Sequence, residues 1–290
     1  MTGHWEFRFP DFDSEEQHRR IRILGRLRSG RPQINVILFL LTIGTTYLIY
    51  RSLLYSAAII AILLSHEMGH YLMCRRYGIR ATLPYFIPMP FPPFGTMGAV
   101  IRMEQTIPNR RALFDVGVAG PLAGLIFTIP SIIFGLKMSE IVSTTSLSSD
   151  VQTLGESLMF TMLSKLVLGS IPEGYDVLLH PLAFAGWAGL FVTALNLLPV
   201  GQLDGGHIIY AILGRKSRYV FRAALLAFIF ICIFYFWGWL LMILFIIWFG
   251  YRHPPPMDDF TPLDTKRKLI GGITFLIFLT SFTPVPFKFH

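Results

Sequence analysis

Long apolar runs, separated by short segments that carry most of the charge, make up most of this chain. We expect a membrane-spanning helix in each of the runs 33–50, 53–74, 112–136, 178–199, 220–236, 237–251 and 268–284. Because about 20 apolar residues of helix cross a bilayer, these runs predict an all-α polytopic membrane protein with six to seven transmembrane helices. The count stays open at 220–251, which either divides into two short spans near Gly238 or forms one long tilted helix.

Basic residues recur in alternate connecting segments. Lysine and arginine cluster at 19–31, 75–80, 102–111, 215–218 and 266–268. Loops with such residues tend to stay on the cytoplasmic side of a membrane. Seven spans with a cytoplasmic N-terminus put all these clusters on that side and put the loop 137–177 outside. Within this loop, 154–169 predicts either an amphipathic helix on the outer membrane surface or an ordinary loop helix.

One apolar segment is unsuited to a continuous helix. Residues 81–103 read ATLPYFIPMPFPPFGTMGAVIRM and contain five prolines, which interrupt helical hydrogen bonding. Non-helical backbone at membrane depth has to be buried in protein or line a cavity. We therefore predict a small re-entrant β-hairpin that enters from the cytoplasmic side. A loop lying on the membrane surface is the alternative.

The composition agrees with this architecture and narrows the class of protein. Hydrophobic residues make up 53% of the 290 residues and charged residues 14%, against about 25% charged in soluble domains. We attribute the net charge of +8 to basic cytoplasmic loops and expect no nucleic-acid partner. We expect a cytoplasmic N-terminal tail at 1–32, a membrane domain at 33–285 and a C-terminal tail at 286–290.

The polar residues of the second apolar run carry the candidate chemistry. His66, Glu67 and His70 form a His-Glu-x-x-His pattern within ILLSHEMGHYL. Positions four apart share one face of a helix, so both imidazoles can hold one zinc ion. Glu67 beside them can act as general base for water that zinc activates. Ionisable groups in a bilayer are costly and usually mark function. A polar trio that only holds helices together is the alternative.

A zinc hydrolase typically uses a third protein ligand, and NLLPVGQLDGGH at 196–207 offers one. Asp204 follows a proline and a glycine and precedes two glycines, which break the helix and let the backbone approach another element. A buried aspartate needs a counter-charge, which zinc provides. His207 is a competing ligand, and capping of a helix N-terminus is the alternative role for Asp204.

With both motifs in view, the chain resembles the site-2 protease family of intramembrane zinc metalloproteases. HEMGH inside one span and NLLPVGQLDGG at the end of a later one carry the resemblance, and VGVAGPLAG at 116–124 is similar to a core helix of that family. The likeness covers about 50–210 and implies a three-helix catalytic core. It implies His66, His70 and Asp204 as ligands of Zn2+ and Glu67 as the catalytic base. We expect neither the PDZ nor the CBS domain that many members carry.

The resemblance also implies a substrate class, namely transmembrane segments of membrane proteins that are cut within or near the lipid bilayer. Asn196 resembles the family asparagine that contacts the substrate backbone or the oxyanion, and an interhelical hydrogen bond is its alternative role. A helix must unwind before cleavage, so we expect the strand-like segment 95–103 to pair with the extended substrate. Gly95 and Gly98 would permit close backbone approach there, unless the hairpin only packs.

Two rival functions stay open at this point. Broken helices with buried ligands also suit a membrane metal transporter, although a transporter needs no general base beside its ligands. A catalytically inactive relative that binds membrane proteins is the second rival. We expect a bacterial cytoplasmic membrane as the location, with a plastid membrane as the alternative. The substrate and the oligomeric state remain open.

Overall fold

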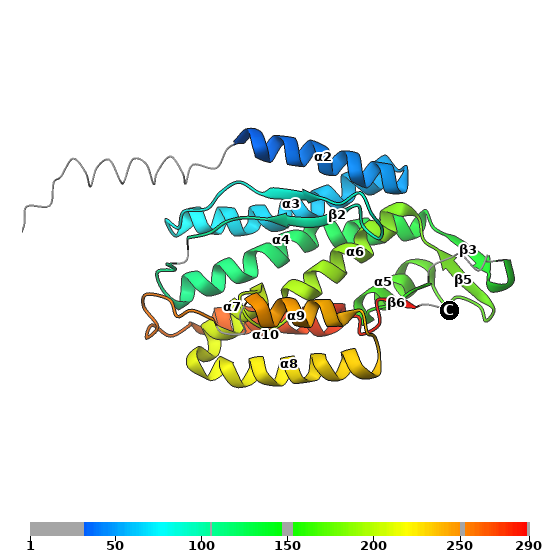
Figure 1. Cartoon of the computed structure of the whole chain (residues 1–290). Coiled ribbons are helices and arrows are strands. Elements are labelled where there is room, and N and C mark those ends of the chain that lie inside the picture. Colours follow the sequence, from blue (N-terminus) through cyan, green and yellow to red (C-terminus); the bar gives the residue numbers. More distant parts are fainter. Residues whose placement is uncertain (1–31, 105, 147–152, 250–252, 289–290) are drawn as a thin grey trace, which may run out of the picture.

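Helices dominate the structure, a computed structural model that describes residues 32–104, 106–146, 153–249 and 253–288 (Figure 1). The helices are α2 (Pro32–Tyr50), α3 (Leu53–Arg76), α4 (Arg110–Lys137), α5 (Leu158–Leu168), α6 (Pro181–Asn196), α7 (Asp204–Leu213), α8 (Ser217–Phe234), α9 (Trp239–Phe249) and α10 (Thr265–Ser281), with short 3-10 turns at Thr144–Ser146 and Gly214–Lys216. Three antiparallel strand pairs join β1 (Tyr85–Pro88) to β2 (Thr96–Val100), β3 (Glu140–Ser143) to β5 (Tyr175–Leu178), and β4 (Thr153–Leu154) to β6 (Phe287–Lys288).

Each predicted apolar run contains a helix, and the run 220–251 is divided near Gly238 into the two helices α8 and α9. The amphipathic segment forms α5. The predicted cytoplasmic tail 1–32 lies outside the described residues except for Pro32. The predicted C-terminal tail contributes strand β6, which pairs with β4.

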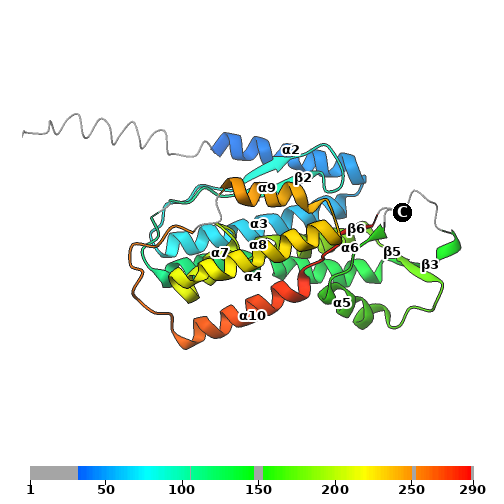
Figure 2. The same ribbon diagram turned by 60° about the horizontal axis from the view of Figure 1, so that its bottom comes forward.

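The long helices lie side by side, which gives the molecule two ends (Figures 1 and 2). We call the end where α3 ends and where α4, α8 and α10 begin the basic end, because the basic residues of 75–76, 110–111, 215–218 and 266–268 lie there. The adjoining segments 77–84, 101–104, 106–109 and 253–264 belong to the same end. The opposite end, formed by 138–146, 153–180 and 282–288, is called the strand end. Helices α3 and α4 meet at the basic end, and α4 and α6 are connected at the strand end.

The outward faces of the helices are those of a membrane protein. Among the described residues, four helical stretches are long and apolar enough to cross a membrane: Pro32–Tyr50, Leu53–Arg76, Arg110–Lys137 and Asp204–Phe234. Large apolar side chains are exposed along them, including Val36, Leu40, Ile126, Phe134, Leu226 and Phe230. Contiguous apolar surface of this kind is rare on soluble monomers and is stable when lipid covers it.

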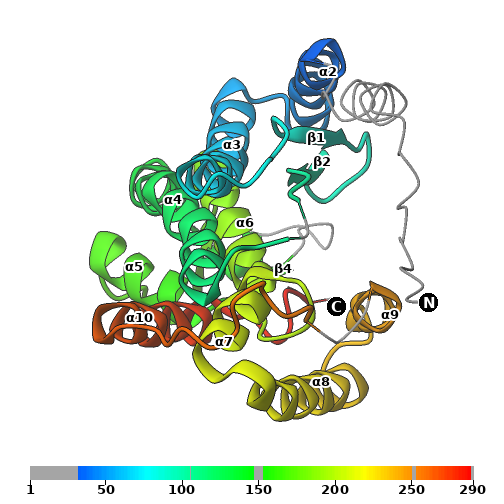
Figure 3. The same ribbon diagram turned by 90° about the vertical axis from the view of Figure 1, so that its left-hand side faces the viewer.

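The β1–β2 hairpin lies along helix α2, as the end-on view shows (Figure 3). Near the start of α2, the Asn35 side-chain amide donates a hydrogen bond to the carbonyl of Pro84 over 2.8 Å. Near its end, the Thr45 hydroxyl donates to the carbonyl of Gly95 over 2.7 Å. A Cβ atom on Gly95 would lie 2.8 Å from the Cα atom of Thr46, so this glycine lets the hairpin press against α2.

A tightly packed core joins α3, α4 and α6. A Cβ atom on Gly135 of α4 would lie 2.1 Å from the backbone nitrogen of Ala183 in α6. One on Gly186 would lie 2.5 Å from a side-chain carbon of Ile132. The two glycines, which have no side chains, therefore allow α4 and α6 to approach closely, as small residues do between membrane helices.

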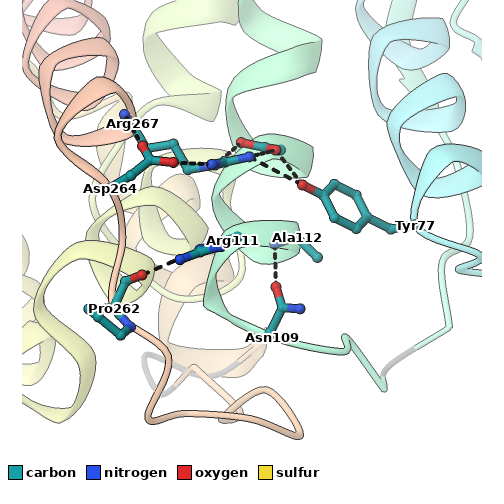
Figure 4. A network of polar contacts seen from close by, with 8 residues as sticks. Tyr77, Asn109, Arg111, Ala112, Pro262, Asp264 and Arg267 are labelled. Carbon is teal, nitrogen blue, oxygen red and sulfur yellow. Dashed lines mark hydrogen bonds and ion pairs between the residues drawn. The ribbon is translucent and has the colours of Figure 1, made fainter.

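A polar network fastens α10 to this core at the basic end (Figure 4). The Arg267 guanidinium donates to the two carboxylate oxygens of Asp115 over 2.8 and 2.6 Å. The Tyr77 hydroxyl donates to the same carboxylate over 2.5 Å. Asp264 caps α10 by accepting from the backbone N–H of Arg267 over 2.8 Å. One carboxylate thus connects α3, α4 and α10.

The close approach of α4 and α6 predicts a stability difference between two glycine variants. Gly135→Ala forces backbone apart and is expected to lower the free energy of unfolding by about 2 kcal/mol, a typical cost of overpacking. Gly44→Ala is the control, because nothing lies within 4 Å of a Cβ atom on Gly44 in α2. Unfolding of the purified protein in detergent measures both. Equal stability of the two variants would refute the packing argument.

Candidate metal centre

The polar residues of the motif in helix α3 are buried inside the protein. His66, Glu67 and His70 are only 5%, 8% and 6% exposed. They lie one helical turn apart at most: His66 and His70 face α4, whereas Glu67 faces the end of β2. The residues of the motif therefore form a buried polar surface on α3. Buried polar side chains need hydrogen-bond or metal partners in the interior.

The Asp204 carboxylate reaches this face from the first turn of α7. Helix α6 ends at Asn196, and the chain turns through Gly201, whose φ of +58 lies in the left-handed region. A Cβ atom on Gly205 would lie 2.0 Å from the Leu197 carbonyl oxygen. The turn can therefore pack against the start of α7 only because residue 205 is glycine. The cap residue of α7 is Leu203, without a side-chain cap bond. Asp204 therefore does not take the capping role.

The three predicted ligands converge. Nε2 of His66 and Nε2 of His70 are 3.1 Å apart, and each lies 3.3 Å from Oδ2 of Asp204. Ligand atoms about 2.05 Å from a tetrahedral zinc ion are about 3.3 Å from each other. The cluster thus has the dimensions of one face of a zinc tetrahedron, and it is the one such cluster of three in the described part of the chain. These residues fit a zinc ion.

The surroundings of His70 prepare it for this role. Its Nδ1 lies 2.8 Å from the carbonyl oxygen of Val116 in α4. A carbonyl only accepts, so Nδ1 carries the hydrogen and Nε2 keeps its lone pair for a metal. A Cβ atom on Gly120 would lie 2.0 Å from Nε2 of His70, whereas one on Gly124 would lie an ordinary 3.4 Å from Cβ of His66. Helix α4 can pass behind the cluster because Gly120 has no side chain.

The other predicted residues lie at different distances from the cluster. Oε2 of Glu67 accepts a hydrogen bond from the backbone N–H of Ile101, just after β2, over 2.9 Å. The amide nitrogen of Asn196 lies 3.2 Å from Nε2 of His66. Gly98, with a φ of +100, has nothing within 4 Å of a would-be Cβ atom, whereas Gly95 is occupied by its contact with α2.

The sequence did not reveal several partners of the centre. The Ile101 amide and the Val116 carbonyl are backbone groups, which no motif displays. The glycines of VGVAGPLAG indicated close packing, but their neighbour proves to be the histidine face of α3. His207, the competing ligand, instead places Nδ1 2.5 Å from Nε2 of His253.

Comparison with known proteins agrees with this geometry. Residues 54–238 match the model of peptidase family M50, and the chain belongs to that family. It is thus a member of a peptidase family, and its own buried centre has the dimensions of a zinc site.

Relatives from plants are named as zinc metalloproteases. The chain is 32% identical over 244 residues to probable zinc metalloprotease EGY2, chloroplastic, of Oryza sativa subsp. indica, covering 81% of this chain and 43% of that protein. It is 30% identical to the EGY1 protein of Arabidopsis thaliana, covering 78% and 42%. The chain spans less than half the length of these relatives. Among solved structures, the site-2 protease from Methanocaldococcus jannaschii matches with 20% identity, a TM-score of 0.35, and coverage of 80% of this chain and 93% of that one.

The two glycines behind the cluster predict different effects on metal binding. Gly120→Ala places a methyl group on the position of His70 Nε2 and is expected to reduce the bound zinc at least tenfold, since losing one ligand's geometry typically costs that much. Gly124→Ala, one helical turn away, is the matched control and should keep its zinc. Elemental analysis of the purified variants decides. Equal zinc content in the two would contradict the proposed fit of α4 against His70.

Proposed function

We propose that this chain is an intramembrane zinc metalloprotease that hydrolyses peptide bonds within or near transmembrane segments of other membrane proteins. The observation that carries the proposal is the buried cluster of His66, His70 and Asp204 with Glu67 directly beside it in sequence and space. The family match and the names of the plant relatives support it.

Each residue receives a role from its position. His66, His70 and Asp204 would hold zinc, which when bound polarises a carbonyl and makes water acidic. Glu67 takes the proton of the attacking water and passes it to the departing amine, as a general base and then a general acid. Its present contact with the Ile101 amide holds the carboxylate near the end of β2. Asn196, whose amide nitrogen lies 3.2 Å from Nε2 of His66, would donate a hydrogen bond to the developing oxyanion.

The outer edge of β2 is the candidate substrate-binding edge. The Thr82 amide donates to the Arg102 carbonyl, so Arg102 faces the β1 side of the hairpin. Backbone groups alternate along a strand, so Ala99 and Ile101 face the other way, toward Glu67. An unwound substrate can add to that edge and recover the backbone hydrogen bonds that it loses. The open space beside Gly98 suits such an approach, whereas Gly95 serves the packing on α2.

The geometry favours proteolysis over the two rival functions. A transporter would place ligands along a path, but the described residues contain one three-residue cluster. An inactive relative would be expected to lack an element of the cluster or the base, and here all four side chains lie together.

We further propose a seven-span topology with the basic end in the cytoplasm. The pairing of β4, in the loop after α4, with β6 near the C-terminus supports it, because both strands then lie on the outer side. The contact of the Trp239 ring N–H with the Pro284 carbonyl, at 2.7 Å, places the start of α9 at the same end. In this topology the β1–β2 hairpin enters the membrane from the cytoplasmic side along α2. We place the protein in a bacterial cytoplasmic membrane or a plastid membrane, and the chloroplastic relatives support the latter.

Proteolysis predicts a separation between metal binding and activity at Glu67. Glu67→Gln keeps the size of the side chain but removes the base, so cleavage of a tagged model transmembrane substrate should fall about 100- to 10,000-fold while zinc stays bound. Glu140→Gln, an exposed change on β3 at the strand end, is the control and should leave cleavage unchanged. Undiminished cleavage by Glu67→Gln would defeat the proposal, and zinc transport that persists in that variant would favour the transporter.

The topology predicts which side of the membrane each end faces. Single cysteines at Glu173 and Lys288 should react with an impermeant maleimide applied from outside. A cysteine at Arg80, at the basic end, should react only after the membrane is opened. All three positions are exposed, and Lys288 lies at the end of the short strand β6. Labelling of Lys288→Cys together with Arg80→Cys would indicate the six-span alternative.

A further inference from the structure

A cavity of about 400 Å³ lies at the basic end beside the candidate centre. Its apolar walls come from Ile101, Ile107 and the prolines of Pro254–Pro256, and its polar groups include Glu104, His207 and His253. The cavity therefore lies between the end of β2, helix α7 and the prolines that precede α10.

The cavity begins where a peptide would be cut. Ile101 forms part of its wall and also donates its backbone N–H to Glu67, the proposed base. His207, which also lines the cavity, lies one helical turn after Asp204 in α7. A substrate strand that runs along β2 past Glu67 would therefore place its next side chains in or above this cavity.

The two histidines give the cavity an uncharged hydrogen-bond acceptor. Nδ1 of His253 lies 2.6 Å from the carbonyl oxygen of Pro254, which only accepts, so that nitrogen carries a hydrogen. Nε2 of His253 then accepts from Nδ1–H of His207 over 2.5 Å, which leaves Nε2 of His207 with its lone pair. Burial lowers the pKa of His253 to about 4, so no positive charge arises there at neutral pH.

Glu104 gives the cavity a negative charge that no described residue neutralises. The other carboxylates at the basic end of the described chain have side-chain partners: Asp115 and Asp264 with Arg267, Asp259 with Tyr210, and Asp258 with Thr261. The carboxylate of Glu104 has neither an ion pair nor a hydrogen bond within the described residues, although its backbone N–H bonds to the Arg80 carbonyl. A carboxylate beside apolar walls favours a cation on a long aliphatic stem.

We propose that this cavity is a specificity subsite for a lysine or arginine side chain on the cytoplasmic side of the scissile bond. The inference rests on the proposed proteolytic function and deepens it. Transmembrane segments carry lysine and arginine just beyond their cytoplasmic boundary, so substrates present this chemistry at the right depth. The proline and isoleucine walls pack against the aliphatic stem, Glu104 pairs with the charged head, and His207 offers an acceptor.

The test reverses the charge of residue 104 in the enzyme and the charge of the facing residue in the substrate. The purified full chain cleaves a model transmembrane substrate whose first residues on the cytoplasmic side of the mapped cleavage site are varied to Arg, Gln or Glu. A partly exposed ion pair changes kcat/KM about fivefold, so wild type should prefer Arg over Glu by about that factor. Glu104→Lys should reverse the preference, and Glu104→Gln should abolish it. Glu140→Lys, a charge reversal at the strand end, should keep the wild-type preference.

The outcomes separate this inference from the function on which it rests. If wild type cleaves and both Glu104→Lys and Glu104→Gln keep its preference for Arg, the subsite is overturned and the proposed proteolysis stands. Equal cleavage of all three substrates by wild type would overturn it as well. No cleavage of any substrate by zinc-loaded wild type would instead overturn the proposed function. Since Glu104→Gln changes only charge, it decides the question even where Glu104→Lys folds poorly.

Discussion

Two imidazole nitrogens and one carboxylate oxygen, all within 3.3 Å of one another, sit in the interior of a helix bundle, and the surrounding architecture serves that convergence. Lone pairs that face each other at such a distance repel unless a cation lies between them. Helix α3 supplies two of the atoms and α7 the third, so both must lie against α4. This is possible because α4 offers Gly120, which has no side chain, and the Val116 carbonyl, which accepts from Nδ1 of His70.

The same arrangement connects the centre to its surroundings on the basic side. The Ile101 amide, at the end of the β2 edge, bonds to Glu67 and also borders the cavity that contains Glu104. The proposed base, the proposed binding edge and the proposed subsite are therefore neighbours that share Ile101. Because the hairpin is pressed along the length of α2, its free edge is held in place toward α3. A loosely attached hairpin would leave the base without a fixed neighbour.

The helices and the composition of the centre were predictable from the sequence, because both depend on local patterns. Apolar runs set helix positions, and the spacing of His66 and His70 brings two rings to one face of one helix. The turn that aims Asp204 was predictable in kind, since a proline and glycines must end α6 there. Contacts between distant elements were not predictable, because they depend on how helices pack. The Ile101 amide at Glu67, the His207–His253 pair and the β4–β6 pairing all belong to that group.

X-ray absorption at the zinc edge of the purified protein tests the central claim most directly. We predict a nitrogen and oxygen shell at about 2.0–2.1 Å, with outer scattering from two imidazole rings only. The Asp204→Ala variant should lose one light atom from that shell or lose the metal. Three imidazole rings would instead indicate His207 as a ligand. A sulfur neighbour at about 2.3 Å, which Cys74 would have to provide, or a wild-type protein that holds no zinc, would contradict the account.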